Sequence, residues 1–332
     1  MPVTADTLMS SSMATALNHA LSYSMDKDDR VIVLGQDVAS CGGVFRVTDG
    51  LLERFGEKRV LNTPLSETLI AGMTAGMSIS GLHPVCELQF MGFAFSALDQ
   101  LINHVSRIRF RTQSKHSAPC VYRVPFGGQI NAPEHHADNY ESLFCSIPGL
   151  RVVCPSSPQA AYDLLNQAIA DPDPVVFLEP ISLYHTTQDI CLETTSFSHK
   201  RCHILSEGSD LTIISWGGMH KTLAKALQSY HKSDISCEII DLVSLNPIDY
   251  ESIFQSVEKT GRCLIIQEGH AMLSLASELC TTINESLFYK LLAPATRLCA
   301  KNTINPPFRY QHTYHPQIED IHAAVDRLLA FS

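Results

Sequence analysis

The sequence predicts a two-domain α/β protein built on parallel sheets, and three observations support this fold class. The chain has 332 residues, which is longer than a chain that folds around one small hydrophobic core usually is. Short apolar, β-branched runs alternate with helical patterns almost throughout, and the runs are apolar on both faces, which is typical of parallel strands covered by helices on both sides. The composition, 45% hydrophobic and 17% charged, is that of a globular protein.

The predicted elements divide the chain into two halves. The first half has expected strands at 31–34, 85–88, 120–123, 151–153 and 175–178, and helices at 11–24, 98–110 and 159–170. The second half has expected strands at 211–216, 237–242 and 263–267, and helices at 222–230 and 321–329. Residues 186–207 are polar and lack a helical period, which indicates a boundary. We therefore expect a first domain at 1–190, a linker at 191–207 and a smaller second domain at 208–332.

Charge and cysteine content exclude several classes of protein. The 34 acidic residues outnumber the 24 Lys and Arg, for a net charge of -10, so the cationic surface that nucleic acid requires is not expected. The eleven cysteines are odd in number and form no C-x-x-C pair, which favours buried thiols in a reducing compartment. The N-terminus does not resemble a secretory signal, and the apolar stretch 69–98 carries His83, Pro84 and Glu87, unlike a membrane span. We expect a cytoplasmic protein.

Glu67 is the first candidate for chemistry. Thr63 is expected as a helix N-cap and Pro64 as the first helical residue, because the missing N–H of proline costs nothing there. Glu67 then lies in the first turn, where a carboxylate that only complements the helix dipole is worth about 0.3–1 kcal/mol. The alternative is a carboxylate at the mouth of a pocket, bonded to a heterocyclic ligand. The residues alone leave both interpretations open.

A histidine pair, His135 and His136, is the second candidate, and it follows the turn at 125–128. It could be an ordinary loop pair or supply a catalytic acid or base. His136-Ala137-Asp138 also has the H-x-D spacing of a two-histidine, one-carboxylate iron site, but the β/α alternation argues against the fold that such a site needs. A third candidate, Asp171 and Asp173 after a helix, fits either a solvated loop or a cation site.

Taken in order, these motifs resemble the β subunit of the thiamine-diphosphate-dependent 2-oxo acid dehydrogenases, in their decarboxylating first component, of the pyruvate and branched-chain types. The resemblance covers nearly the whole chain and depends on blocks at 42–46, 59–67, 87–90, 99–100, 123–128, 136, 148–153, 174–180, 207–212 and 259–262. It implies a pyrimidine-type thiamine-diphosphate-binding domain with a parallel sheet, followed by a smaller α/β domain like the C-terminal domain of transketolase.

The resemblance also implies roles for individual residues. Glu67 would bond N1′ of the aminopyrimidine ring of thiamine diphosphate, and the cofactor would act as the electron sink for loss of carbon dioxide. His136 would stabilise or protonate intermediates, while Gln89 and Phe93 would wall the pyrimidine pocket. A structural potassium ion would be held by Ala118, Cys120, Val121, Ala168, Asp171 and Asp173.

The absence of a phosphate-cradling glycine loop is explained by the same resemblance, because the α subunit of the family holds Mg²⁺ and the diphosphate. The chain would then supply half of an active site in an α₂β₂ heterotetramer, with the second domain docking the lipoyl acyltransferase core. The reaction would be oxidative decarboxylation of a 2-oxo acid with acyl transfer to lipoamide. Pyruvate is favoured, and the branched-chain acid 3-methyl-2-oxobutanoate is the alternative.

Two departures from the family pattern keep other functions open. Gln36 stands where the family usually has Glu, and residues 267–274 lack a glycine pair. A catalytically decayed scaffold or regulatory subunit would show such changes. A split transketolase is a further alternative, but it would need phosphate-binding Arg and His residues that we cannot place.

Overall fold

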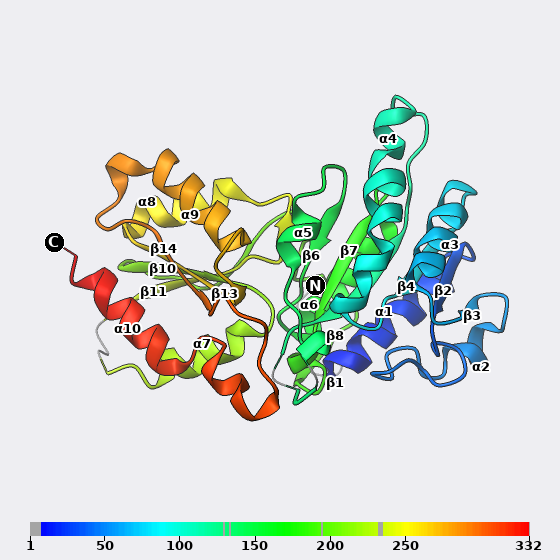
Figure 1. Ribbon diagram of the computed structural model, residues 1–332, viewed down its shortest axis with the longest axis horizontal. Helices are drawn as coiled ribbons and strands as arrows, with labels where there is room; N and C mark the ends of the chain where they lie inside the picture. Colours follow the sequence, from blue (N-terminus) through cyan, green and yellow to red (C-terminus); the bar gives the residue numbers. More distant parts are fainter. Residues whose placement is uncertain (1–7, 129, 133, 194, 232–234, 332) are drawn as a thin grey trace.

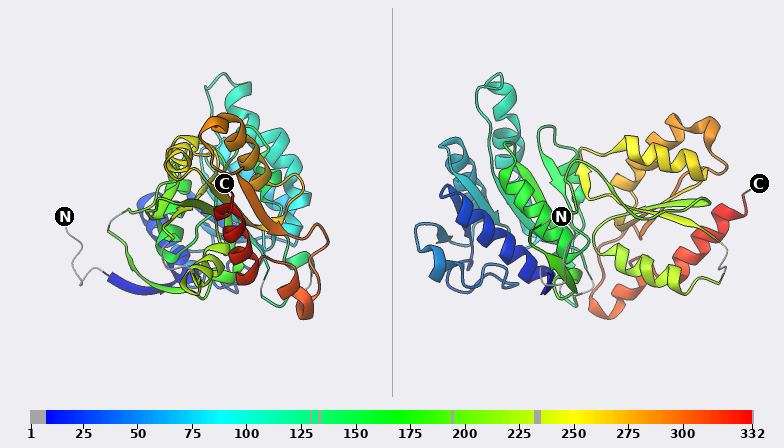
Figure 2. Two further views of the ribbon diagram at one scale, coloured as in Figure 1. Left: turned by 90° about the vertical axis from the view of Figure 1, so that its left-hand side faces the viewer. Right: turned by 180° about the vertical axis from the view of Figure 1, so that it is seen from behind.

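The structure is a computed structural model that describes residues 8–331 apart from 129, 133, 194 and 232–234. It contains two α/β domains that stand side by side, as Figures 1 and 2 show. Each has one main sheet in which most neighbouring strands are parallel, so the predicted fold class is confirmed.

The first sheet has seven strands in the order β12-β6-β7-β5-β4-β2-β3. Their bounds are β2 Val31–Gly35, β3 Val60–Asn62, β4 His83–Glu87, β5 Val121–Phe126, β6 Arg151–Val153, β7 Val175–Pro180 and β12 Ser244–Asn246. All five strands predicted for this half are present. β12 comes from the second half of the chain and pairs antiparallel with β6.

Helices cover both faces of this sheet, which explains why its strands are apolar throughout. Along β7, Val175 and Phe177 join a core cluster with α1 and α6, whereas Val176 and Leu178 join another with α3 and η2. This alternation is the two-residue period of a strand. The helices and helical turns of this domain are α1 Met13–Lys27, α2 Leu51–Phe55, α3 Glu67–Ile79, η2 Met91–Ala97, η3 Gln100–His104, η4 Val105–Arg107, α4 Ile108–Arg111, η5 Glu134–His136, α5 Glu141–Cys145, α6 Pro158–Ala170 and η6 Ile181–Leu183.

The second sheet has five strands in the order β14-β13-β10-β11-β9. Their bounds are β9 His203–Ser206, β10 Leu211–Ser215, β11 Cys237–Asp241, β13 Cys263–His270 and β14 Thr296–Ala300. Figure 1 shows α8 and α9 on one face of this sheet and α7 and α10 on the other. The helical elements here are α7 Met219–Gln228, α8 Tyr250–Thr260, α9 Leu275–Ser286, η7 Phe288–Lys290, η8 Phe308–Thr313 and α10 Ile318–Leu329.

The predicted helical stretch at 98–110 is present, but it is irregular. The structure has a succession of short π, 3₁₀ and α turns there, from η3 to α4. Gly149 packs so closely on this segment that a Cβ atom at that position would lie 2.1 Å from the carbonyl oxygen of Ser106. Sequence periodicity does not report such a contact, since it joins residues 43 positions apart.

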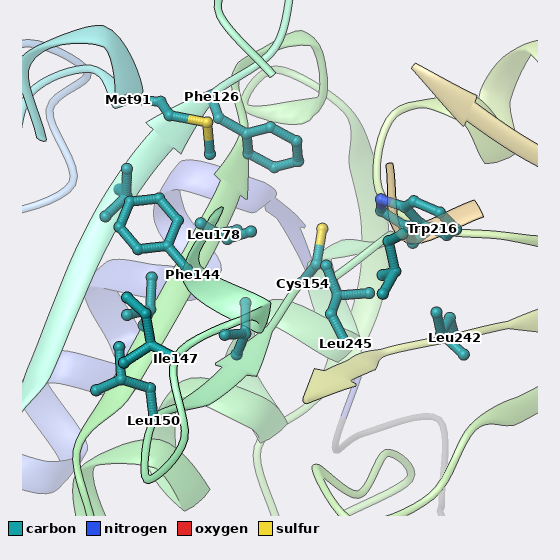
Figure 3. Close-up of a cluster of buried hydrophobic side chains, with 14 of the residues drawn as sticks. Met91, Phe126, Phe144, Ile147, Leu150, Cys154, Leu178, Trp216, Leu242 and Leu245 are labelled. Carbon is teal, nitrogen blue, oxygen red and sulfur yellow. The ribbon is translucent and has the colours of Figure 1, made fainter. Parts of the chain in front are cut away.

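One of the hydrophobic core clusters contains buried residues of both domains. Figure 3 shows Phe126, Phe144 and Leu178 of the first domain on the same cluster as Trp216 and Leu242 of the second. Trp216 is buried, and burying a large apolar side chain contributes about 1.5–3 kcal/mol. We infer that the two sheets are held in a defined relative position.

Residues 191–207, which we expected as a linker, run from the end of β8 (Thr187–Cys191) to β9. β8 pairs with β1 (Leu8–Ser12), whereas β9 is an edge strand of the second sheet. The exact domain limits remain a prediction. In the part of the chain that the structure describes, no helix is long and apolar enough to span a membrane. The eleven cysteines, all of them within described residues, form no disulfide bonds with one another.

Candidate active site

Glu67 is the first residue of α3, so the predicted helix start at Thr63 and Pro64 was wrong by about one turn. Ser66 is the N-cap, and its hydroxyl accepts a hydrogen bond from the N–H of Leu69 at 3.4 Å. Thr63 does not cap the helix: its N–H donates to the carbonyl of Gly35 at 2.9 Å and extends the pairing of β3 with β2, and its hydroxyl has no partner among the described residues. Glu67 still lies in the first turn, as predicted, and is partly exposed.

The carboxylate of Glu67 is free for a ligand. Among the described residues it makes no hydrogen bond or ion pair. Two large apolar residues near it in the sequence are exposed: Leu65 is 72% exposed and Leu69 43%. An unpaired carboxylate within an apolar surface indicates a site that another molecule covers.

His136 lies in η5, edge-on to two phenyl rings. Its ring centroid is 4.4 Å from that of Phe90 and 5.3 Å from that of Phe93. Burial lowers the pKa of His136, the neighbouring His135 lowers it further, and Glu134 partly opposes both. The Nδ1 atom of His136 is buried and has no hydrogen-bond partner among the described residues. The lowered pKa favours the neutral imidazole, which can accept a proton.

The element η2 joins Glu67 to His136. Phe93 lies on η2 and contacts His136, while the hydroxyl of Thr68 in α3 donates to the carbonyl of Ser96 in η2 at 2.7 Å. Gln89 is partly exposed in the link between β4 and η2. These segments follow β3, β4 and β5, whose carboxyl ends lie at one edge of the parallel sheet. That edge is where ligands bind in such folds.

A buried ionic cluster below this edge was missed by the sequence reasoning. The guanidinium of Arg123 donates to Glu179 at 2.7 and 2.8 Å and to Glu87 at 2.7 Å, and all three side chains are at most 3% exposed. Burial raises the pKa of Glu87, although Arg123 opposes it. The only signal in the sequence was the presence of charged residues within apolar strands.

This cluster supports the aromatic wall of the site. The hydroxyl of Tyr184 donates to Glu179 at 2.5 Å, and its ring stacks on Phe45 with centroids 4.6 Å apart. Phe45 in turn lies edge-on to Phe90, with centroids 5.5 Å apart. Contacts therefore extend from Glu179 in the ionic cluster through Tyr184 and Phe45 to Phe90. The ring of Phe90 lies against His136.

The predicted potassium ligands lie at the opposite edge of the sheet. The carbonyl of Cys120 accepts the N–H of Val175, just after the loop that carries Asp171 and Asp173. Ala168 lies in the last turn of α6, and its carbonyl accepts the N–H of Asp171 at 3.3 Å. Ala118 and Val121 are buried next to Cys120 in the chain.

Both carboxylates of that loop already have protein partners. Asp171 lies 2.9 Å from Nε of Arg151 and 3.3 Å from Nε2 of His199, and Asp173 accepts from Arg109 at 2.6 Å. Burial alone would raise the pKa of Asp171, but hydrogen bonds from His199 and from the Asp173 N–H, with the charge of Arg151, lower it. Among the described residues, no group of three or more His, Cys, Asp or Glu side chains could hold a metal ion, which also applies to the H-x-D segment.

Comparison with known proteins agrees with this architecture. Residues 9–187 match the family described as "Transketolase, pyrimidine binding domain", and residues 200–321 match "Transketolase, C-terminal domain". A solved structure, "Split gene transketolase, inactive beta4 tetramer", superposes with a TM-score of 0.79 at 20% identity, covering 96% of this chain and 98% of that chain, which shows the fold. Fold and site thus define a transketolase-like protein of two domains.

Relatives with higher identity narrow this class. The chain is 41% identical to "Pyruvate dehydrogenase E1 component subunit beta" of Acholeplasma laidlawii, over 94% of this chain and 96% of that protein. It is 38% identical to the Bacillus subtilis protein of the same name, over 96% and 98%. It is 40% identical to "3-methyl-2-oxobutanoate dehydrogenase subunit beta" of Mycobacterium tuberculosis (strain H37Rv), over 98% and 93%.

The chain belongs to the family of β subunits of the 2-oxo acid dehydrogenase first component (E1), as its motifs predicted. It is therefore a subunit of an oxidoreductase that works together with an α subunit. Membership carries a general dependence on thiamine diphosphate.

Proposed function

We propose that this chain supplies one half of the active site that decarboxylates a 2-oxo acid, with pyruvate as the favoured substrate. One observation carries the proposal. The unpaired carboxylate of Glu67 and the neutral imidazole of His136 both lie at the carboxyl edge of the first sheet, joined through η2. One group is available to bind a heterocycle, and the other to move a proton.

The residues present fit thiamine diphosphate. When bound, the cofactor supplies the electron sink for loss of carbon dioxide. Glu67 would share a proton with N1′ of the aminopyrimidine and so favour its imino tautomer, with Phe93 and Gln89 against the ring. His136, whose Nδ1 lacks a partner among the described residues, would hold or deliver a proton on the substrate side. The two phenyl rings against it shield part of the imidazole from solvent, which strengthens such interactions.

The rest of the site is proposed to come from the α subunit, which would hold Mg²⁺ and the diphosphate in an α₂β₂ heterotetramer. The exposed Leu65, Leu69 and Phe95 beside Glu67 support a partner that covers this face. We further propose that the assembly works in the cytoplasm and passes its acyl group to a lipoyl acyltransferase core. A potassium ion near Ala168 would depend mainly on backbone carbonyls, because the two nearby carboxylates are already paired.

The proposal is tested by coexpressing the chain with its α subunit. Thiamine diphosphate binding is measured by calorimetry, and decarboxylation is measured with pyruvate and with 3-methyl-2-oxobutanoate. Glu67→Gln is expected to weaken cofactor binding and to reduce decarboxylation by at least about 100-fold. The control is Glu251→Gln, which removes a carboxylate from the first turn of α8.

If the two variants behave alike, Glu67 only complements its helix. If neither the chain alone nor the coexpressed protein binds thiamine diphosphate, the enzymatic proposal fails and the scaffold function remains.

A further inference from the structure

The backbone next to His136 is held from the second domain. The side-chain amide of Asn305 donates to the carbonyl of Ala137 at 2.9 Å, across 168 residues of sequence. Asn305 is buried. The same carbonyl accepts a longer bond, 3.5 Å, from the amide of Asn139. The Ala137–Asp138 peptide, one residue beyond His136, is therefore anchored by the second domain.

A second attachment lies at the start of the same loop. The N–H of Gly128 donates to Oε1 of Glu268 at 2.8 Å, and Glu268 is buried in β13. The N–H of Gly127 donates to the carbonyl of Asp138 at 3.1 Å. This bond couples the two ends of the loop, so Glu268 also restrains the residues around His136.

The packing leaves little freedom for movement. A Cβ atom on Gly128 would lie 2.6 Å from Nε2 of His315 in the second domain. On the other side, a Cβ atom on Gly92 of η2 would lie 2.4 Å from the carbonyl oxygen of His135. Residues 134–138, here called the histidine turn, are thus clamped between η2 and the second domain.

We infer that Asn305 and Glu268 are positioning residues for His136. The second domain holds the histidine turn so that the imidazole stays against Phe90 and Phe93, where the reaction needs it. This inference depends on the proposed role of His136. A displacement of about 1 Å in such a group costs on the order of 100-fold in rate, so a hydrogen bond far from the substrate can control the reaction.

The sharpest test is Asn305→Asp in the α-containing complex. The carboxylate has the same shape as the amide but cannot donate to Ala137, and it places two acceptors face to face. We expect kcat to fall about 10- to 100-fold. The KM for the 2-oxo acid should change less than about 2-fold, because Asn305 is proposed to act only on the histidine turn and not on the substrate.

A matched control separates positioning from general loss of stability. Asn284 also donates its amide to backbone carbonyls, those of Cys280 at 2.7 Å and Ala295 at 3.2 Å, away from the histidine turn. Asn284→Asp should lower the melting temperature but leave kcat of the folded enzyme unchanged. Equal losses of kcat in the two variants would overturn the inference.

Glu268 provides a second pair of variants. Glu268→Gln keeps an acceptor for the N–H of Gly128 and should retain most of the activity. Glu268→Ala removes the acceptor and should lower kcat in the same manner as Asn305→Asp. An equal effect of both Glu268 variants would contradict the role assigned to this hydrogen bond.

A readout that does not need turnover distinguishes this inference from the proposed function. The imidazole of His136 is titrated by NMR in the full-length chain and assigned with His136→Gln. Burial lowers the pKa of His136, so loosening the turn should raise it toward the ordinary histidine value. Asn305→Ala, which adds no charge, must shift the pKa of His136 in the same direction as Asn305→Asp does. The facing groups Glu134 and His135 are unchanged in both variants.

The outcomes are separable. If the wild-type complex does not decarboxylate a 2-oxo acid but the titration of His136 moves in the variants, the proposed function fails and the positioning stands. If the complex is active and neither kcat nor the titration responds to Asn305→Asp, the positioning fails.

Discussion

At the scale of single residues, the site depends on which charges face His136. Its pKa is lowered by burial and by His135, and raised by Glu134. The ring centroids of the two histidines are only 4.2 Å apart, so a charge on His135 disfavours protonation of His136. A neutral imidazole is thus a consequence of neighbours in the sequence as well as of packing.

We predict that His135→Gln raises the pKa of His136, because it removes the neighbour that opposes protonation. NMR titration of His136 in the full-length chain measures this shift. The effect should be smaller than that of Asn305→Ala, since burial is the larger cause. Glu134→Gln is the control of opposite sign and should lower the pKa. Shifts of the same sign in these two variants would contradict the assignment.

At the scale of elements, the glycine turn at Gly43 lets the backbone pass close to the buried carboxylate of Glu87. Gly43 has a φ of +77°, and a Cβ atom there would lie 3.2 Å from Oε1 of Glu87. Gly50 has nearly the same φ, +74°, but nothing lies within 4 Å of its Cβ position. The two positions therefore separate backbone strain from contact with the ionic cluster.

Gly50→Ala should cost about 1 kcal/mol of unfolding free energy through the left-handed backbone alone. Gly43→Ala should cost about 1–3 kcal/mol more, because the new methyl group displaces Glu87 from Arg123. Denaturant unfolding of the two variants gives the difference. Equal costs would show that the ionic cluster tolerates the displacement.

The helix α5 carries another buried acidic residue, Glu141, which accepts a hydrogen bond from Nε1 of Trp216 at 3.2 Å. Burial raises the pKa of Glu141 from 4.5 to about 7. The unfolded chain has the ordinary value, so the stability associated with protonated Glu141 is present below pH 4.5 and is lost as the pH rises to about 7.

Glu141→Gln should remove this pH dependence, because the amide stays neutral and keeps the oxygen that Trp216 binds. At pH 8 the variant should be more stable than the wild type, by at most about 3 kcal/mol. At pH 4 the two proteins should be equally stable. Thermal unfolding at both pH values measures this, and a constant difference between them would contradict the titration of Glu141.

At the scale of the whole molecule, the shared core makes the domains interdependent. Trp216 is the only tryptophan of the chain, and it lies where the two domains meet (Figure 3). The histidine turn in one domain is anchored by Asn305 and Glu268 in the other. The second domain therefore fixes part of the backbone beside the proposed site.

We predict that the two domains unfold together. Trp216 fluorescence reports the contact between domains, and far-ultraviolet circular dichroism reports the helices of both, so the two denaturant midpoints should coincide. Trp216→Phe keeps an aromatic ring in the core and is the control for the dichroism curve. An earlier fluorescence transition would show that the domains separate before either unfolds.

Much of the fold was predictable from local patterns. The central strands β2, β5, β7 and β10 are buried on both faces, so their apolar runs are unmistakable. The strands that we did not predict are short or at edges. In β9, for example, three of the four residues are exposed, so no apolar pattern distinguishes it from a loop.

The sequence by itself determined the alternation of strands and helices, the family, and the candidates Glu67 and His136, because these depend on local residue patterns and on the order of motifs. The tertiary structure decided the rest. In the structure α3 begins at Glu67 with Ser66 as its N-cap, whereas Thr63 extends the pairing of β3 with β2. The guanidinium of Arg123 bonds both Glu87 and Glu179. The anchoring of the histidine turn by Asn305 joins residues far apart in the chain. Such contacts arise only when distant segments pack, so no local pattern encodes them.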